Sequence, residues 1–249
     1  MCDYKSHHAA HLPFRNSFFW CNLLYASSPM EKKESYRHTL PHFQKQGQAY
    51  FVTWSLKDAI PHKVVYKAAR KLNLLRLQIK TLEQLPSEFM ALARAKKEYF
   101  QYRKKYIQAY AEILDNCKSP AINLSDPEIV EILVSTLQFW HGRKINNFAF
   151  TVMPNHVHWV FELYPRNQDG NPLYLQDLMQ SVKRFSSNRI NKVLGRTGPL
   201  WQKESFDTTI RNYRHLQCAI RYTLNNPVKA GLVGNWTDWP GTWGGCRGF

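Results

Sequence analysis

The chain has 249 residues and a formal net charge of +16, from 34 Lys and Arg against 18 Asp and Glu. Hydrophobic residues make up 44% and aromatic residues 14%, which suffices for a sizeable core and excludes a fully disordered basic tail. The length fits one domain with an insertion or two small domains. Such a charge favours a polyanionic partner such as nucleic acid, although a merely solvated basic surface remains an alternative.

The cysteines and the hydropathy indicate a cytoplasmic protein. Five cysteines lie far apart with no Cys-x-x-Cys pair, which argues against a zinc ribbon and a disulfide framework. No apolar run approaches the roughly 20 residues that span a bilayer, so no membrane association is expected.

The N-terminal third of the chain changes character twice. Residues 1–47 contain clustered histidines and mixed charges without periodicity, which predicts a loosely ordered basic arm. Residues 49–56 are rich in β-branched and aromatic residues, which predicts the first strand. Pro61 ends this strand.

A basic helical hairpin is expected as an insertion over about 61–118. Apolar residues recur at helical spacing over 62–85 and 87–114, Pro86 separates the two runs, and Ser87 is a candidate N-cap for the second helix. Lysines and arginines alternate with tyrosines in the second run. Two interpretations stay open, a solvated helical face and a DNA-facing surface.

The remaining elements follow from caps, turns and periodicity. Asp126 followed by Pro127 predicts a helix start. Further along the chain, Leu178, Met179, Val182 and Phe185 are expected to point inward from a helix. The expected elements are strands over 147–153 and 154–163, a helix over 175–194, a strand over 201–210, and a helix over 213–225 that Pro227 ends.

His156-Val157-His158 is the first motif with chemical content. On a strand, residues two apart project to the same face, so both imidazoles can chelate one divalent ion while Val157 points into the core. Imidazole suits Mn, Co, Ni and Zn and is less usual for Mg. Two half-exposed histidines on a sheet remain the alternative for this motif alone.

The second motif covers residues 220–233. Tyr222 and Asn226 are four apart and share one helix face. Because Pro227 disfavours helical geometry at Asn226, we expect the helix to end there and the amide to turn toward a site. Its carbonyl oxygen is a reasonable hard ligand beside two imidazoles, while a buried, hydrogen-bonded tyrosine remains the alternative for Tyr222.

The two motifs together resemble the REP-associated tyrosine transposases, single-tyrosine members of the HUH endonuclease superfamily. The resemblance rests on Met153-Pro-Asn-His-Val-His158 and on Tyr222-x-x-x-Asn226-Pro-Val-Lys-Ala-Gly-Leu-Val, with weaker matches over 50–54 and 198–211. It covers about residues 48–60 and 120–243. The long insertion and the N-terminal arm depart from a compact member of that family.

The resemblance implies a fold and a set of roles. The fold is α+β, a ferredoxin-like (RRM-like) antiparallel sheet with helices packed on one face. By position, Tyr222 matches the catalytic nucleophile, and His156, His158 and Asn226 match the metal ligands. The implied activity is Mg²⁺- or Mn²⁺-dependent nicking and strand transfer beside REP-like hairpins in single-stranded DNA, through a 5′-phosphotyrosine.

The candidate DNA contacts and the alternatives complete the expectations. Lys183, Arg184, Arg189 and Arg211 are candidates for the DNA backbone, and Trp201 either stacks on an unpaired base or belongs to the core. The expected domain spans 48–243, with a short tail over 244–249, and acts as a monomer or homodimer. A catalytically silent hairpin-binding protein and an RNA-binding module are the alternative functions.

Overall fold

An antiparallel sheet forms the centre of the computed structural model, which describes residues 35–37, 41–43, 47–60, 62–116, 121–203 and 205–245. Its five strands run in the order β6-β3-β5-β4-β7. Their bounds are β3 (Ala49–Ser55), β4 (Ile145–Val152), β5 (His156–Leu163), β6 (Phe206–Thr209) and β7 (Thr242–Gly244). All neighbouring strands pair antiparallel, so the predicted α+β fold is confirmed.

The central strand β5 divides its side chains between two covered faces. Val157, Trp159 and Phe161 point to the first face. His156, His158 and Val160 point to the second face. All six side chains are buried, so packed material covers both sides of the sheet.

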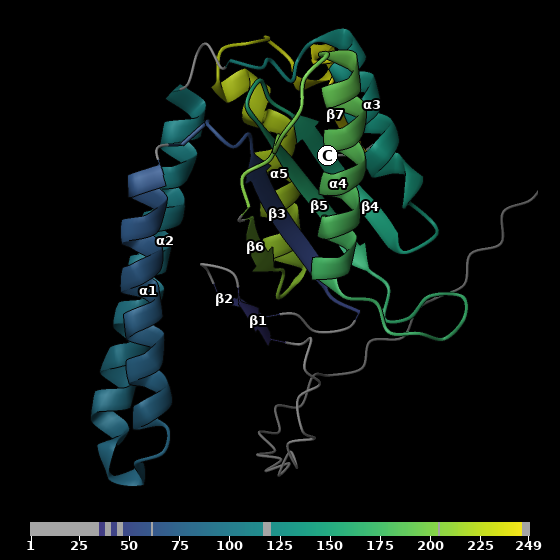
Figure 1. The fold of residues 1–249 in the computed structure, drawn as a ribbon. Coiled ribbons are helices and arrows are strands. Elements are labelled where there is room, and N and C mark those ends of the chain that lie inside the picture. The colour runs from purple at the N-terminus through teal and green to yellow at the C-terminus, as the bar shows by residue number, and fades with distance from the viewer. Residues whose placement is uncertain are drawn as a thin grey trace, which may run out of the picture. The chain divides into compact units, whose positions relative to one another are not determined.

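The first face carries the larger core. Helices α3 (Pro127–Phe139) and α4 (Leu175–Val193) pack over it, and Figure 1 shows α4 in front of the sheet. The carboxylate of Asp126 accepts a hydrogen bond from the Glu128 backbone N–H at 3.1 Å, which confirms the predicted helix start. Phe185 was expected to point inward, but it is 53% exposed because it lies outside the buried stripe of α4, to which Val182 and Ser186 belong.

The second face carries α5 (Tyr213–Lys229), followed by the 3-10 turn η2 (Trp236–Asp238). Val160 of β5 packs there against Ala219, Ile220 and Leu224. Helices therefore cover both faces rather than one, because apolar side chains on the second face also need cover. Figure 1 shows α5 behind the sheet.

The predicted helical hairpin consists of α1 (His62–Leu82) and α2 (Phe89–Asn116). The 3-10 turn η1 (Pro86–Glu88) joins them, and its N-cap is Leu85. Ser87 is therefore not the cap of α2, because Pro86 takes the first position of the turn and leaves Ser87 inside it.

Two further boundaries differ from the sequence-based expectation. The strand expected over 201–210 is reduced to β6, and Trp201 forms only an isolated bridge with Leu56. The helix expected to end at Asn226 continues through Pro227 to Lys229. Pro227 is buried, and its carbonyl accepts a hydrogen bond from the Leu232 backbone N–H at 3.0 Å, so packing outweighs the missing N–H.

Part of the expected N-terminal arm is paired. Strands β1 (Ser35–Arg37) and β2 (Pro41–Phe43) form a two-stranded antiparallel sheet, while residues 1–34 and the end of the expected tail, 246–249, lie outside the described residues. Every described residue belongs to one unit, Glu31–Phe249. Among the described helices, none combines the length and apolar character needed to cross a membrane.

Candidate active site

The histidine pair lies on β5, on the same face as α5. His156 and His158 are 1% and 2% exposed. Their Nε2 atoms face each other at 3.0 Å, because strand geometry sends residues two apart in the same direction. The sequence-based expectation that both imidazoles project to one face while Val157 points into the core is confirmed.

Each imidazole is oriented through its other ring nitrogen. Asn155 donates from Nδ2 to the Leu114 carbonyl at 2.9 Å, so its Oδ1 accepts from His156 Nδ1 at 2.6 Å. His158 Nδ1 bonds to Thr53 Oγ1 at 2.7 Å. Because a neutral imidazole carries one proton, the proton on Nδ1 leaves Nε2 of His156 with a free lone pair. Such partners orient and tune metal-binding histidines.

The pair has the chemistry and spacing of a chelating site. Burial lowers the pKa of His156 to about 4 and places the pKa of His158 well below its ordinary value, so both rings are neutral near pH 7. If two nitrogens each lie about 2.1 Å from an ion and the angle between them at the ion is a right angle, the nitrogens are about 3.0 Å apart. The two Nε2 atoms have this separation. Among the described residues, no three His, Cys, Asp or Glu side chains form a metal-binding group, so a third ligand from these residues would be of another type.

Tyr222 faces this pair from α5. Its ring lies 5.3 Å from the His158 ring and 5.8 Å from the Phe51 ring, both edge to face. Burial raises the pKa of the Tyr222 phenol, and the negative charge of Asp115 raises it further. The phenol is therefore protonated near pH 7, and its ionisation requires a nearby cation or base.

Asn226 lies one helical turn beyond Tyr222 and is 1% exposed. Neither Oδ1 nor Nδ2 of its amide has a hydrogen-bond partner of ordinary geometry, although the amide lies near enough to Tyr222 to lower that phenol's pKa. A buried amide without partners is costly. The side-chain oxygen of Asn226 therefore fits the role of a third metal ligand beside the two imidazoles. The continuation of α5 past Pro227 holds Asn226 at helical spacing from Tyr222.

An ion pair that the sequence did not reveal lies beside Tyr222. Lys229 Nζ donates to Asp115 Oδ2 at 2.8 Å and lies 5.9 Å from the centre of the Tyr222 ring. The hydrogen bond that Lys229 donates to Asp115 raises the pKa of Lys229, so the ammonium stays charged. The other carboxylate oxygen of Asp115 is buried without a hydrogen-bond partner.

Two consecutive residues of α2 thus reach the site, Leu114 through Asn155 and Asp115 through Lys229. Lys229 belongs to the Tyr222-x-x-x-Asn226-Pro-Val-Lys motif, so the motif contained a signal for it. No sequence pattern marks Asp115, because it lies more than a hundred residues from Lys229, in a helix with many other charged residues.

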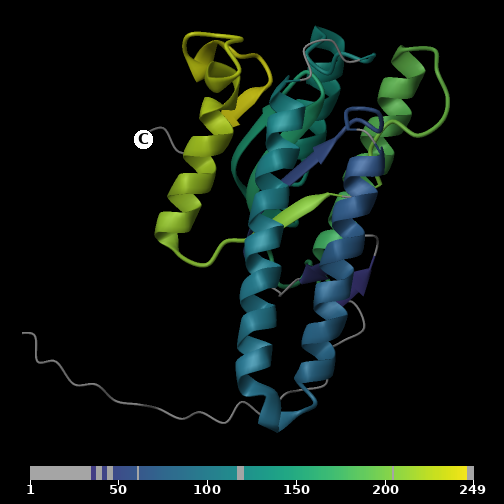
Figure 2. The ribbon, with the colours of Figure 1, turned by 90° about the vertical axis from the view of Figure 1, so that its left-hand side faces the viewer.

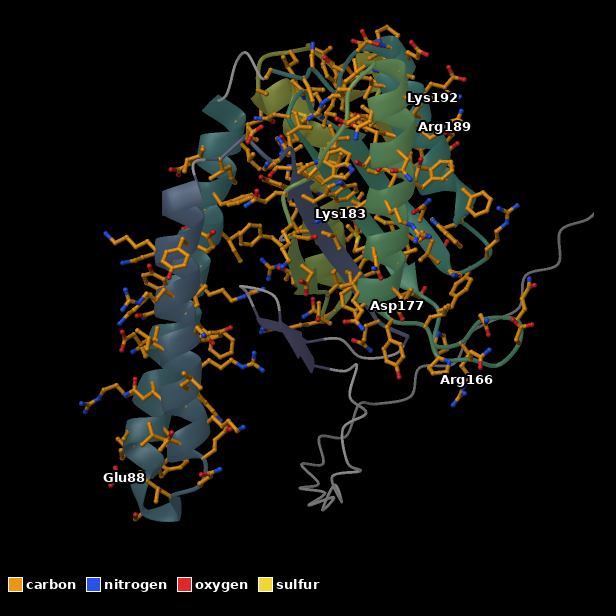
Figure 3. All side chains as sticks on the ribbon, viewed as in Figure 1. Glu88, Arg166, Asp177, Lys183, Arg189 and Lys192 are labelled. Atoms are coloured by element: carbon orange, nitrogen blue, oxygen red, sulfur yellow. The ribbon has the colours of Figure 1, made fainter. Side chains whose placement is uncertain are left out.

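Most of the candidate DNA contacts lie away from the histidine pair. Lys183, Arg184 and Arg189 belong to α4, which packs on the opposite face of the sheet. Figure 3 shows Lys183 and Arg189 on that helix. Lys183 Nζ donates to the backbone carbonyls of Gln202 and Lys203, whereas the two arginines are exposed. Arg211 is exposed just before α5.

Trp201 belongs to the core. Its side chain is 7% exposed, its ring lies 6.1 Å from the Trp54 ring, and its indole N–H donates to Ser186 Oγ at 3.0 Å. Of the two alternatives for Trp201, the core role is confirmed and base stacking is contradicted, because the indole is buried and its N–H is already bonded inside the protein.

The described chain is therefore an α+β protein whose buried histidine pair faces a tyrosine on a crossing helix. No family model matches it. It is 28% identical over 100 residues, 37% of this chain and 54% of the relative, to a Haemophilus influenzae protein provisionally named REP-associated tyrosine transposase. This similarity confirms the resemblance inferred from the two motifs. The chain spans about half the length of that relative.

A solved structure is also similar. It is described as a REP-associated tyrosine transposase bound to a REP hairpin, with 16% identity and a TM-score of 0.44. The match covers 83% of this chain and 80% of that one.

Proposed function

We propose that this chain is a metal-dependent endonuclease and strand transferase that nicks single-stranded DNA beside hairpin, REP-like sequences. The observation that carries the proposal is the contact of the Tyr222 ring with His158, whose Nε2 faces that of His156 at 3.0 Å. The substrate class rests on the similarity to a protein named as REP-associated. The strand must be unpaired at the cut, because a phosphate fixed in a duplex is hard to align with a tyrosine on a rigid helix.

In the proposed reaction, the Tyr222 phenolic oxygen attacks the scissile phosphorus. The new bond joins the tyrosine to the 5′ phosphate, and the bond from phosphorus to the 3′ oxygen breaks. The phenol releases its proton to water, and the leaving 3′ oxygen takes one up. A tyrosyl phosphodiester keeps much of the transfer potential of the broken bond, so a second 3′ hydroxyl can reverse the step without ATP.

His156, His158 and Asn226 would hold the divalent ion, Mg²⁺ or Mn²⁺. When bound, it would polarise the scissile phosphate and offset the charge that develops during transfer. Thr53 and Asn155 keep the two imidazoles turned toward the site. The Lys229 ammonium, fixed by Asp115, adds a positive charge beside the tyrosine.

Substitution of Tyr222 by phenylalanine tests the proposal. Labelled single-stranded oligonucleotides with hairpins from beside the gene are incubated with the protein in Mg²⁺, Mn²⁺ or EDTA, and the products are separated on a denaturing gel. We expect a metal-dependent nick and a protein-linked band that both disappear in Tyr222→Phe. Hairpin affinity should stay within a few-fold, because only a hydroxyl is removed from a ring that keeps its contacts.

Two outcomes would contradict the proposal. Tight hairpin binding without an adduct in any metal would favour the catalytically silent binding protein. A collapse of hairpin affinity in Tyr222→Phe would show that the tyrosine is structural. Tyr213→Phe is the matched control, since Tyr213 is exposed at the start of the same helix.

A further inference from the structure

A cavity of about 340 Å³ opens beside Tyr222, between α2 and the sheet. One wall comes from β3 and β6, the other from α2, and Figure 2 shows α2 crossing the sheet beside α5. His158, Tyr222 and Lys229 line it as well. The cavity is therefore continuous with the candidate active site.

The lining divides into parts of different chemistry. Phe51, Phe206 and Ile107 provide an apolar, largely aromatic surface, whereas Lys229 provides a positive charge next to the tyrosine. Gln108 and Glu112 also line the cavity, four residues apart on one face of α2. A nucleotide has three matching parts: an anionic phosphate for the positive charge, a flat aromatic base for the apolar surface, and a polar base edge for Gln108 and Glu112.

The α2 wall is anchored to the sheet by specific polar bonds. The Tyr110 hydroxyl bonds to Ser55 Oγ at 2.9 Å, and Arg103 donates to the Asp207 carbonyl at 2.8 Å. Five residues beyond Tyr110, Asp115 accepts a hydrogen bond from Lys229. These bonds involve residues on both sides of Gln108 and Glu112, so the wall that those two side chains occupy is fixed against the site.

We propose that this cavity binds an unpaired base next to the phosphodiester that Tyr222 attacks, with Gln108 and Glu112 reading its polar edge. The inference rests on the proposed function and names its substrate contact. A carboxylate repels a second phosphate and accepts from N–H groups, so Glu112 favours a base with an exocyclic amino group over thymine. The helical insertion is, on this account, the part of the chain that selects the cleavage position.

The test measures single-turnover nicking of hairpin oligonucleotides with each base, or an abasic site, on either side of the cut. Loss of the base at one of these positions should slow wild-type nicking about tenfold or more, the scale of one stacked base. Glu112→Gln and Gln108→Ala should shrink the preference for an amino-bearing base about fivefold or more at that position alone. Gln101→Ala is the matched control, because Gln101 lies two turns earlier on α2 and does not line the cavity.

A second measurement separates this inference from the proposed function. A 2-aminopurine at the same position, bound to Tyr222→Phe protein, should lose its fluorescence by stacking, and Glu112→Gln should weaken that quenching without any chemistry. Quenching by Tyr222→Phe, together with no nicking of the same DNA by the wild-type protein, would support the base site and contradict the endonuclease. Nicking with tolerated abasic sites, unchanged base preferences in the variants, or no quenching would overturn the base site.

Discussion

Asp115 and Lys229 couple the insertion to the nucleophile through one ion pair. The carboxylate fixes the ammonium at 2.8 Å, and the ammonium lies beside the Tyr222 ring. Lys229 is 59% exposed and would otherwise sample many rotamers, so the pair chiefly keeps its charge in place. Asp115 is accordingly a positioning residue.

Asp115→Asn should slow nicking about tenfold at saturating DNA, because a neutral amide holds the ammonium less firmly than a carboxylate does. Hairpin affinity should change less than threefold. The single-turnover rate and the dissociation constant, measured separately, check this split. Glu98→Gln is the control, since Glu98 lies on the same helix as Asp115 and forms an exposed ion pair with Lys71 of α1. Equal rates in both variants would contradict the positioning role.

The buried histidines make stability depend on pH. Burial lowers the pKa of His156 from 6.5 to about 4, so between these pH values the unfolded chain binds more protons than the folded one. Stability from this group is present above pH 6.5 and is lost as the pH falls toward 4, with a limiting slope of about 1.4 kcal/mol per pH unit. His158 adds in the same direction.

Urea unfolding at several pH values, with EDTA present, measures this slope. His156→Gln removes one titrating ring and should flatten the curve between pH 4.5 and 6.5 by about 1 kcal/mol per pH unit. Identical slopes in the wild type and in His156→Gln would contradict the assigned pKa.

Mn²⁺ should raise the unfolding midpoint of the wild type but not of His158→Ala, which tests the ligand assignment without an activity assay.

At the scale of elements, the edge strand β7 and the residues just before it pack tightly against β4. Trp239 donates from Nε1 to the Val152 carbonyl at 2.7 Å, and Val152 N–H donates to the Gly241 carbonyl at 2.9 Å. A Cβ on Gly241 would meet Val152 Cβ and its carbonyl oxygen, both at 2.9 Å. The backbone therefore approaches too closely for any side chain at this position.

Gly241→Ala should lower the free energy of unfolding by about 1–3 kcal/mol, as overpacking does elsewhere. Denaturant unfolding checks this change. Gly234→Ala is the matched control, because a Cβ there meets nothing within 4 Å, so its effect should stay within about 0.5 kcal/mol. Equal stability of the two variants would contradict the tight packing of β7 on β4.

Local signals explain which elements could be predicted from the sequence. The cap at Asp126, the turn residues before β5 and the periodicity of α1 and α2 act within a few residues. The start of α3 and the bounds of the other three elements were therefore predicted to within about three residues. The end of α5 was not, because tertiary packing of Pro227 outweighs a local rule.

The residues of the candidate site also separate into those that local spacing predicted and those that it did not. His156, His158, Tyr222 and Asn226 were found because their spacing within an element predicts a shared face. Asp115 was missed because its partner, Lys229, lies in another element, and no local pattern encodes that contact. Trp201 was ambiguous because a tryptophan near basic residues suits both a core and a base-stacking role.

At the scale of the whole molecule, charge and chemistry lie on different faces of the sheet. The exposed arginines of α4, Arg184 and Arg189, lie over the first face, and the histidine pair lies on the second. In the proposed function the +16 net charge would attract DNA to both faces, and the described groups proposed for phosphoryl transfer lie on the second.

Replacement of Arg184 and Arg189 by alanine should therefore weaken binding without slowing the chemistry. We expect the slope of log affinity against log salt to fall by about two, one for each phosphate contact. The single-turnover rate at saturating DNA should stay within twofold of wild type. Binding titrations at 50–200 mM salt check this result, and an unchanged slope would exclude α4 as a DNA-binding surface.

The most direct measurement is the position of the covalent DNA–protein bond. After reaction with a hairpin oligonucleotide and Mn²⁺, the protein is digested with nuclease and trypsin and analysed by mass spectrometry. We predict a nucleotide linked through its 5′ phosphate to Tyr222, on the peptide of residues 222–229 that trypsin releases after Arg221. A nucleotide on any other peptide, or cleaved DNA with no peptide modified, would contradict it.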